Sequence, residues 1–350
     1  TNSDAMEVDT EAMESSMEFT QQGSMVYKGF KINQQGVQIS PERDGQVSPF
    51  MLKDIKLLEV LGRGTSSVVK KGENTLTGEK MAVKILGTVY NPELRKALHS
   101  ELKLLMPKLQ ETPSPYIVRV IDVFYPKEED MIYIVLELCD AGSLNTAIKN
   151  SGKASEKVVS VVMRQIFLAL AFLFDHGIQH RDIKPSNVLL TSHGAVKLSD
   201  FGSSKEDVNA ETFCGTTRYM SPERLNGHEY TPKADVWSAG MVMLEMGFGD
   251  HPYHVCFGTD GSFVAMIEYA TKYDTPQLDE SYSDHARGFA GLCMAKKPEQ
   301  RPTPGMLVRP ENLGASHPFI AQHAQQGNQV VAEWIQQGVR KVGPLLSVAS

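Results

Sequence analysis

The sequence predicts an α+β protein in two lobes, a strand-rich N-terminal lobe followed by a larger helical one. Residues 55–139 contain the alternating or continuous apolar runs that are typical of strands, with one predicted helix between them. Residues 140–320 open with the long apolar helical segment SEKVVSVVMRQIFLALAFLFDHG, and helical patterns predominate from Lys233 onward. Strands followed by helices along the chain indicate an α+β architecture.

The composition is that of an ordinary globular protein. The chain has 350 residues, of which 41% are hydrophobic, enough for one two-lobed unit with tails. A formal net charge of -7 gives no general basis for nucleic-acid binding. The four cysteines are far apart, which fits a reducing compartment. No apolar run approaches the roughly 20 residues of a membrane span, and the acidic N-terminus lacks a signal peptide's apolar core. We therefore expect a cytoplasmic protein without membrane insertion.

Residues 1–54 are expected to precede the folded lobes. Residues 1–24 contain six acidic and no basic side chains, a composition that predicts a disordered tail. The following segment, GFKINQQGVQIS, alternates apolar residues around a Gln-Gly turn and predicts a short hairpin. The segment SPERDGQVSP is typical of a linker.

Four strand-like segments and one helix make up the N-terminal lobe. The strand segments are IKLLEVLG, SVVKKGENTLTGEKMAVKIL, YIVRVIDVFY and MIYIVLEL. The helix runs from Pro92 to about Leu109, because Asn91 is a good N-cap and proline suits the first helical position. Glu101 lies beside its apolar stripe, which consists of Leu94, Leu98, Leu102 and Leu105.

The segment LGRGTSSVVKKG joins the first two strands. Gly62 and Gly64 would let backbone amides approach phosphates closely, where a side chain would block them. The GxGxxG pattern is incomplete, because Ser67 occupies the third glycine position. Taken alone, the segment is more typical of a plain hairpin turn.

Lys84 lies in MAVKIL, among otherwise apolar strand residues. A lysine in a strand usually just reaches solvent at an edge. Glu101 argues otherwise, because a carboxylate near the buried face of a helix needs a cation, and leaving it unpaired costs several kcal/mol. A Lys84–Glu101 pair would supply that cation and aim the ammonium at two phosphates. Without the other motifs, Glu101 would be the flank residue of a solvated helix.

The segment HRDIKPSNVLL carries the strongest signal for chemistry. Phosphoryl transfer needs a carboxylate that orients the attacking hydroxyl and accepts its proton, and Asp182 is suited to this. Lys184, two residues on, adds a positive charge that would stabilise the transferring phosphoryl group. Asn187 and Asp200, the latter in LSDFG, offer the oxygen ligands that Mg²⁺ prefers.

In this order the segments resemble the eukaryotic protein kinases, over roughly Ile55 to Ile320. That family has a glycine loop, a strand lysine, HRD…N, DFG and APE, and the catalytic parts of this pattern are all present in order except the third glycine. The resemblance implies a bilobal kinase-like fold with ATP and Mg²⁺ as cofactors. It implies catalytic roles for Asp182 as base, Lys184, Lys84 on the α- and β-phosphates, and Glu101 as partner of Lys84. The implied metal ligands are Asn187 and Asp200.

The resemblance also implies an adenine site and two structural contacts. Adenine would lie between Leu61, Val69, Ala82 and Leu189, hydrogen-bonded to the hinge backbone at Glu137 and Cys139, with Leu136 as gatekeeper. The remaining nucleotide-binding residues would be Gly62, Arg63 and Gly64. SPE stands where the family has APE, so Glu223 should pair with Arg301, and Asp235 of DVWSAG should brace the catalytic loop. The lysine in DIKPSN resembles the serine/threonine type.

Several segments are similar to those of MAP kinase kinases, namely SPYIV, CDAGSL, GTTRYMSPERL and VAEWIQQ. The segment GFKINQQGVQIS resembles plant and protist members. This resemblance implies a dual-specificity kinase that phosphorylates Thr and Tyr of a T-x-Y loop in a MAP kinase, with an upstream MAP kinase kinase kinase as activator. Another serine/threonine kinase is an alternative. A pseudokinase scaffold is a second, but it predicts loss of Lys84, Asp182 or Asp200, and all three are present.

The segment between DFG and SPE is expected to act as a switch. Thr212 occupies the second of two positions that are phosphorylated in MAP kinase kinases, whereas Val208 or Glu206 stands at the first. A phosphate on Thr212 would order the segment by pairing with Arg181. The alternative is an exposed loop hydroxyl, while Thr216 is expected to be structural.

The C-terminal segment is predicted to be helical, with Val331, Trp334, Ile335 and Val339 on one face. This face would either receive the upstream kinase or pack on the large lobe. The acidic N-terminal tail contains no basic cluster for docking a MAP kinase.

Overall fold

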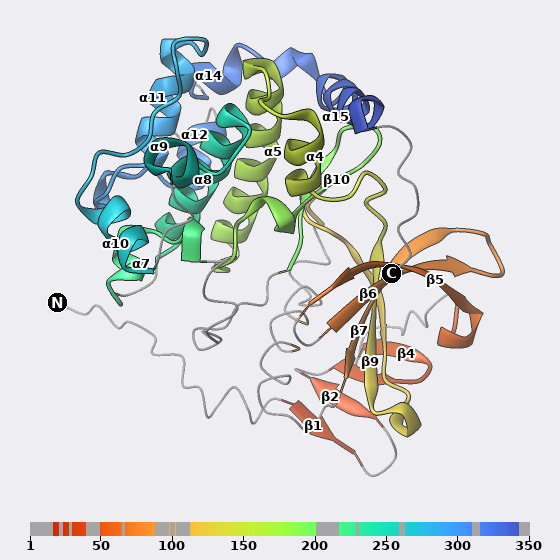
Figure 1. Ribbon diagram of the computed structural model, residues 1–350. Helices are drawn as coiled ribbons and strands as arrows, with labels where there is room; N and C mark the ends of the chain where they lie inside the picture. The colour runs from red at the N-terminus through yellow and green to blue at the C-terminus, as the bar shows by residue number, and fades with distance from the viewer. Residues whose placement is uncertain are drawn as a thin grey trace. The chain divides into compact units, whose positions relative to one another are not determined.

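The computed structural model describes residues 17–20, 24–27, 30–39, 50–64, 67–87, 98, 102, 113–200, 217–228, 231–258, 263–309 and 316–342. They form two compact units (Figure 1). The small unit comprises Thr1–Leu98 and Arg119–Leu138, and the large unit comprises His99–Val118 and Cys139–Ser350. The first is built from strands and the second mostly from helices, which confirms the predicted α+β class.

The small unit is built on a five-stranded antiparallel sheet in the order β5-β6-β7-β9-β8. The strands are β5 (Ile55–Arg63), β6 (Ser67–Asn74), β7 (Lys80–Gly87), β8 (Val120–Phe124) and β9 (Met131–Glu137). Two short 3₁₀ turns accompany them, η1 (Leu52–Asp54) and η3 (Lys127–Glu129). One face of the sheet buries a core of Phe50, Ile55, Met81, Val83, Phe124, Tyr133 and Val135. The β-branched and aromatic residues of these strands suit such a half-buried surface.

A second sheet, here called the N-terminal meander, belongs to the same unit. Its strands, in the order β1-β2-β3-β4, are β1 (Met17–Phe19), β2 (Met25–Tyr27), β3 (Phe30–Asn33) and β4 (Gly36–Ile39). It contacts the edge strand β8, where the Val37 N–H donates to Asp122 Oδ1 at 3.0 Å. The Tyr125 N–H donates to the Asn33 carbonyl, also at 3.0 Å. Met25 and Ile32 are fully buried.

The meander corrects the expectation that residues 1–54 precede the fold. The predicted hairpin is present as β3 and β4, but β1 lies inside the stretch expected to be disordered, and β2 follows it. Phe50, which directly follows the predicted linker, belongs to the core. Strands of three residues are too short to show an alternating pattern, and their burial depends on partners distant in sequence. Residues 1–16 lie outside the described residues.

The predicted Pro92 helix is described at two positions. Leu98 and Leu102, two members of its apolar stripe, are helical and are 2% and 1% exposed. Glu101 lies outside the described residues, as do Leu94 and Leu105. The predicted pairing of Lys84 with Glu101 therefore stays a prediction.

The large unit is arranged around α5 (Glu156–Asp175), which contacts α8, α12, α14 and α15 (Figure 1). Among the described helices, α5 has the length and apolar composition to cross a membrane, and 72% of that stretch is buried in the protein. It is the core helix of this unit. The other helices are α4 (Leu144–Ser151), α7 (Pro222–Leu225), α8 (Lys233–Phe248), α9 (Pro252–Phe257), α10 (Phe263–Thr271), α11 (Asp284–Cys293), α12 (Pro304–Val308), α14 (Pro318–Ala321) and α15 (Gln329–Val342). A two-stranded sheet, β10 (Val188–Leu190) with β11 (Val196–Leu198), and the 3₁₀ turns η4 (Pro185–Asn187), η5 (Thr217–Tyr219), η6 (Pro298–Gln300) and η7 (Ala324–Gln326) complete it.

The C-terminal helix α15 packs its apolar face on α4 and α5. Val331 is fully buried, and Trp334 and Ile335 are 6% and 9% exposed. The Ser151 hydroxyl, at the end of α4, donates to the Trp334 carbonyl at 3.1 Å. Of the two alternatives for this segment, packing on the large unit is the one that the structure shows. Val339 alone of the predicted face is largely exposed.

Candidate active site

The loop that carries Asp182 connects α5 to β10, and Asp235 of α8 fixes its backbone. The two carboxylate oxygens of Asp235 accept the N–H groups of His180 and Arg181, each at 2.9 Å. Asp235 is 3% exposed, so these bonds are shielded from water. Arg181 has φ 71°, an uncommon conformation for a residue with a side chain. The surrounding contacts therefore hold the loop in a shape that it would not adopt alone.

His180 is fully buried beneath this loop. Its Nδ1 accepts the Asp182 N–H at 3.3 Å, and its Nε2 lies 3.0 Å from the Ser199 carbonyl. Burial lowers the pKa of the imidazole, although nearby Asp235 and Asp182 oppose that shift. A neutral ring with its proton on Nε2 satisfies both contacts. His180 thereby joins the Asp182 loop to the end of β11.

Asp182 is held by two neighbours through the same oxygen. Lys184 Nζ lies 2.8 Å from Asp182 Oδ2, and the Asn187 amide donates to that oxygen at 2.9 Å. The same Asn187 amide nitrogen also donates to the Asp182 carbonyl at 2.9 Å. Both side-chain contacts are made to Oδ2 and neither to Oδ1 within the described residues. Oδ1 is therefore the oxygen available to a substrate hydroxyl.

Asn187 and Asp200, the predicted Mg²⁺ ligands, come from two adjacent segments. The Ser199 N–H donates to the Asn187 carbonyl at 2.9 Å, and Asp200 follows directly with φ 57°. The Asn187 amide nitrogen is engaged by Asp182, whereas its side-chain oxygen accepts a long bond of 3.5 Å from the Ser186 hydroxyl and is the atom that would face a cation. One amide oxygen and one carboxylate are the donors that Mg²⁺ prefers beside phosphate and water. The residues present therefore fit the ion that the kinase resemblance implies.

The small unit supplies the predicted phosphate-binding residues. Lys84 is 9% exposed and lies between Val69 of β6 and Ile134 of β9 in the sheet register. Gly62 has no described atom within 4 Å of the place where a Cβ would stand, so its backbone is open to a ligand. Arg63, the last residue of β5, pairs with Val68.

The loop after β5 is closed by Gly64 and Ser67. The Gly64 N–H donates to the Ser67 carbonyl at 2.8 Å, and a Cβ on Gly64 would lie 3.0 Å from Ser67 Oγ. Ser67 is not among the described non-glycine residues with positive φ. Serine at the third glycine position therefore needs no left-handed backbone, which is the condition under which we expect nucleotide binding to survive.

The predicted adenine contacts come from both units. In the small unit, Ala82 pairs in register with Leu136, and Leu61 is 48% exposed. The Glu137 N–H donates to the Arg119 carbonyl at 3.0 Å, so that N–H is already engaged. In the large unit, Leu189 of β10 bridges to Ser143, and the Cys139 carbonyl accepts from Gly142.

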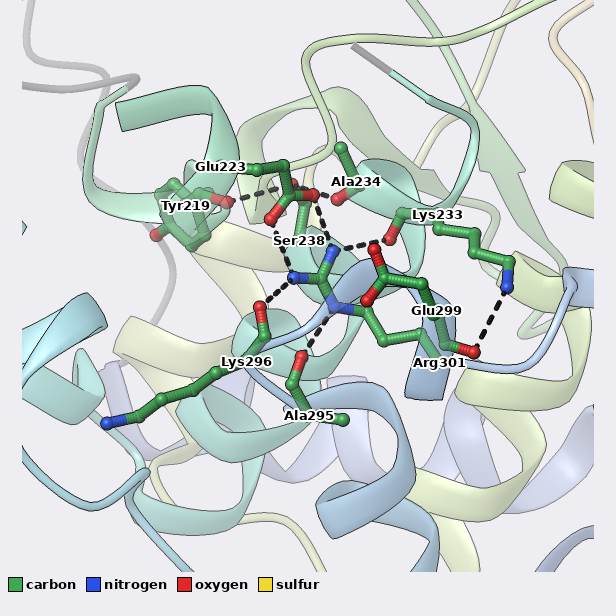
Figure 2. A network of polar contacts seen from close by, with 9 residues as sticks. All are labelled: Tyr219, Glu223, Lys233, Ala234, Ser238, Ala295, Lys296, Glu299 and Arg301. Atoms are coloured by element: carbon green, nitrogen blue, oxygen red, sulfur yellow. Dashed lines mark hydrogen bonds and ion pairs between the residues drawn. The ribbon is translucent and has the colours of Figure 1, made fainter. Parts of the chain in front are cut away.

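Glu223 and Arg301, which were expected from the sequence to pair, form a buried, bidentate ion pair (Figure 2). Arg301 Nη1 and Nη2 each donate to one Glu223 oxygen at 2.7 Å. The other guanidinium protons go to the carbonyls of Ala295, Lys233 and Lys296. Burial alone would raise the pKa of Glu223, but the hydrogen bonds and charge of Arg301 outweigh it and lower the pKa. The pair ties α7 to the segment before α12.

Sequence reasoning missed a second buried contact in this region. Tyr219 of η5 donates from its hydroxyl to Glu245 of α8, and Ser238 donates to the Tyr219 carbonyl (Figure 2 shows the latter). Tyr219 and Glu245 are 26 residues apart, and neither belongs to a motif that we used. Several predicted residues lie outside the described residues, namely Glu101, Glu206, Val208, Thr212 and Thr216.

Comparison with known proteins identifies the family. Residues 55–313 match the protein kinase domain. The chain belongs to the protein kinase family. Among its relatives is Mitogen-activated protein kinase kinase 2 of Arabidopsis thaliana, 32% identical over 324 residues that cover 88% of this kinase and 86% of the relative.

Two further relatives come from an animal and a fungus. The Dual specificity mitogen-activated protein kinase kinase dSOR1 of Drosophila melanogaster is 31% identical over 84% of this kinase and 76% of its own length. MAP kinase kinase skh1/pek1 of Schizosaccharomyces pombe is 35% identical over 76% of this kinase and 73% of its own length. A protein kinase domain implies the use of ATP, to which the small-unit residues above are suited.

Proposed function

We propose that this kinase is a MAP kinase kinase, which phosphorylates Thr and Tyr of the T-x-Y loop of a MAP kinase. The observation that carries the proposal is the extent of its likeness to the named relatives. The kinase domain match covers residues 55–313, whereas the alignment with the Arabidopsis relative spans 324 residues. The likeness therefore includes sequence outside the domain that all protein kinases share.

The large unit supports a role for Asp182 as catalytic base. A substrate hydroxyl donates to Asp182 Oδ1, its oxygen forms the bond to the γ-phosphorus, and its proton passes to the carboxylate. The bond from that phosphorus to the bridging oxygen breaks, and ADP leaves. Lys184, 2.8 Å from Asp182, balances the charge that spreads over the transferring group. Asn187 and Asp200 would hold Mg²⁺, which neutralises phosphate charge when bound.

Activation is proposed to occur at Thr212 by an upstream MAP kinase kinase kinase. The support is the position of Thr212 between DFG and SPE and the charge of Arg181. The Arg181 guanidinium donates to Gln179 Oε1 at 3.3 Å, a long bond that a phosphate would replace with shorter charge-assisted ones. Phosphorylation would thereby connect the segment to the residue before Asp182.

The test is mass spectrometry of a catalytically inactive MAP kinase after incubation with this kinase, ATP and Mg²⁺. Wild type, Asp182→Asn and Thr212→Glu would be compared. We expect phosphate on both the Thr and the Tyr of the T-x-Y loop, lost in Asp182→Asn and increased in Thr212→Glu. Activity on myelin basic protein without T-x-Y phosphorylation would instead indicate another serine/threonine kinase. ATP binding without transfer to either substrate would indicate a pseudokinase scaffold.

A further inference from the structure

Arg224 contacts the catalytic loop, although it belongs to a different element. It lies in α7, directly after Glu223, and its Nη1 donates to the Arg181 carbonyl at 2.7 Å. The two residues are 43 positions apart in the sequence. The distance is that of a strong charge-assisted hydrogen bond.

The carbonyl that Arg224 holds belongs to the peptide that joins Arg181 to Asp182. The N–H of Arg181 is already fixed by Asp235 of α8, at 2.9 Å. Arg181 is therefore held from both ends, by α8 at its N–H and by α7 at its carbonyl. This matters because its φ of 71° is uncommon for a residue with a side chain, and such a conformation persists only where its surroundings impose it.

Rotation of this peptide would redirect the Asp182 side chain. Without the Arg224 bond, the carbonyl of Arg181 loses a cationic donor that holds its direction, and the backbone relaxes toward negative φ. Asp182 then leaves the position in which Lys184 and Asn187 hold its Oδ2. A misplacement of about 1 Å at a reacting group costs on the order of 100-fold in rate.

The element that carries Arg224 is itself rigidly held. Glu223 is bound by Arg301 through two bonds of 2.7 Å, and that pair is buried. α7 also follows η5 closely in the chain, with Met220 and Ser221 between them. A fixed α7 can therefore transmit its position to the Asp182 loop through a single side chain.

We propose that Arg224 is a positioning residue for phosphoryl transfer, which acts by holding the Arg181 carbonyl and thereby orienting Asp182. In this role Arg224 acts through Arg181 and Asp182 and not on the reacting atoms. The inference rests on the kinase family and the role of Asp182, not on which protein is the substrate.

The test compares single-turnover phosphoryl transfer by wild type, Arg224→Met and Arg224→Lys. The control is Arg287→Met, which breaks a similar bond from a half-buried arginine on α11 to the Tyr282 carbonyl, 3.2 Å in length. The substrates are an inactive MAP kinase and, separately, myelin basic protein with labelled ATP. Transfer to myelin basic protein alone would contradict the MAP kinase kinase proposal and leave this test intact.

Arg224→Met should lower the transfer rate at least about 10-fold while the Kd for ATP changes less than about 2-fold. Arg224→Lys, which keeps a cationic donor, should recover part of the loss, and Arg287→Met should leave the rate unchanged. If Arg224→Met does not fold, Arg224→Lys carries the test with a smaller loss of rate. An unchanged transfer rate in the folded variants, or equal losses in Arg224→Met and Arg287→Met, would overturn the proposal.

Discussion

The hydroxyl of Tyr219 donates to the Glu245 carboxylate at 2.6 Å inside the large unit. Tyr219 is in η5 and Glu245 is in α8, where it is 7% exposed. Ser238, also in α8, donates to the Tyr219 carbonyl at 2.8 Å. The short stretch between the predicted switch segment and α7 is thus fastened to the helix that also holds the catalytic loop.

The Glu245 contact should make stability depend on pH. Burial raises the pKa of Glu245 from 4.5 to about 7, and Asp250 contributes, while the Tyr219 bond and the cations Arg218 and Lys149 oppose the shift. When the pKa of a carboxyl group is higher in the folded than in the unfolded state, the group stabilises the fold fully at pH values below its unfolded pKa. This stabilisation is lost as the pH rises from the unfolded pKa through the folded pKa. The free energy of unfolding should therefore fall by up to about 3 kcal/mol between about pH 5 and pH 8.

Glu245→Gln provides the comparison, because an amide oxygen still accepts the Tyr219 hydroxyl and cannot ionise. Urea unfolding across this pH range should show the decline in wild type and a flatter profile in Glu245→Gln. Parallel profiles for the two proteins would show that Glu245 does not titrate in this range.

Removal of Arg301 should be among the most damaging changes in the large unit. Arg301→Met leaves the Glu223 carboxylate and three backbone carbonyls without their donors, in a site where Arg301 is 1% exposed. An unpaired buried charge of this kind costs about 3–5 kcal/mol. The double variant Glu223→Leu/Arg301→Met removes the charge as well, so it should unfold at higher urea than Arg301→Met. If the double variant is less stable than Arg301→Met, the loss of stability comes from lost packing and not from the unpaired Glu223 carboxylate.

The N-terminal meander should be sensitive to a methyl group at Gly36. Gly36 has φ 110°, and a Cβ there would lie 2.9 Å from Asp122 Oδ2, whose carboxylate also accepts the Val37 N–H. Gly78→Ala is the matched control, because Gly78 also has positive φ but has no described atom within 4 Å of a Cβ. Gly36→Ala should cost about 1–3 kcal/mol more than Gly78→Ala and speed amide hydrogen exchange in β3 and β4. Equal costs would mean that backbone strain alone matters at Gly36.

Two helical glycines should respond to alanine with opposite signs. A Cβ on Gly338 of α15 would stand 2.1 Å from Ser151 Oγ and 3.0 Å from the Ser151 nitrogen, so Gly338→Ala should push α15 off α4. Gly288 of α11 has no described atom within 4 Å of its Cβ position. Alanine is a better helix former than glycine, so Gly288→Ala should stabilise by up to about 1 kcal/mol. A rise in Tm for Gly338→Ala would contradict the close contact between α15 and α4.

The sequence was most informative about contacts between residues that are close together in the chain. Asp182, Lys184 and Asn187 lie within six residues, so their contacts follow from a short loop whose motif is distinctive. Arg224 and Arg181 are 43 residues apart, and nothing local to either signals their bond. Tyr219 and Glu245, which share a hydrogen bond, are likewise 26 residues apart and are brought together only by the tertiary fold. The short strands β1 and β2 were missed for a related reason, since their burial comes from tertiary contacts and not from their own pattern.

The meander also determines where the chain can be cut. The kinase domain match begins at residue 55, but the core residue Phe50 and the four strands of the meander lie before it. A recombinant fragment begun at Ile55 would uncover β8, the outermost strand of its sheet, and deprive Asp122 of the Val37 N–H. Bare strand edges pair with one another. Such a fragment would self-associate and precipitate, whereas one begun before Met17 would keep its β8 covered and remain monodisperse.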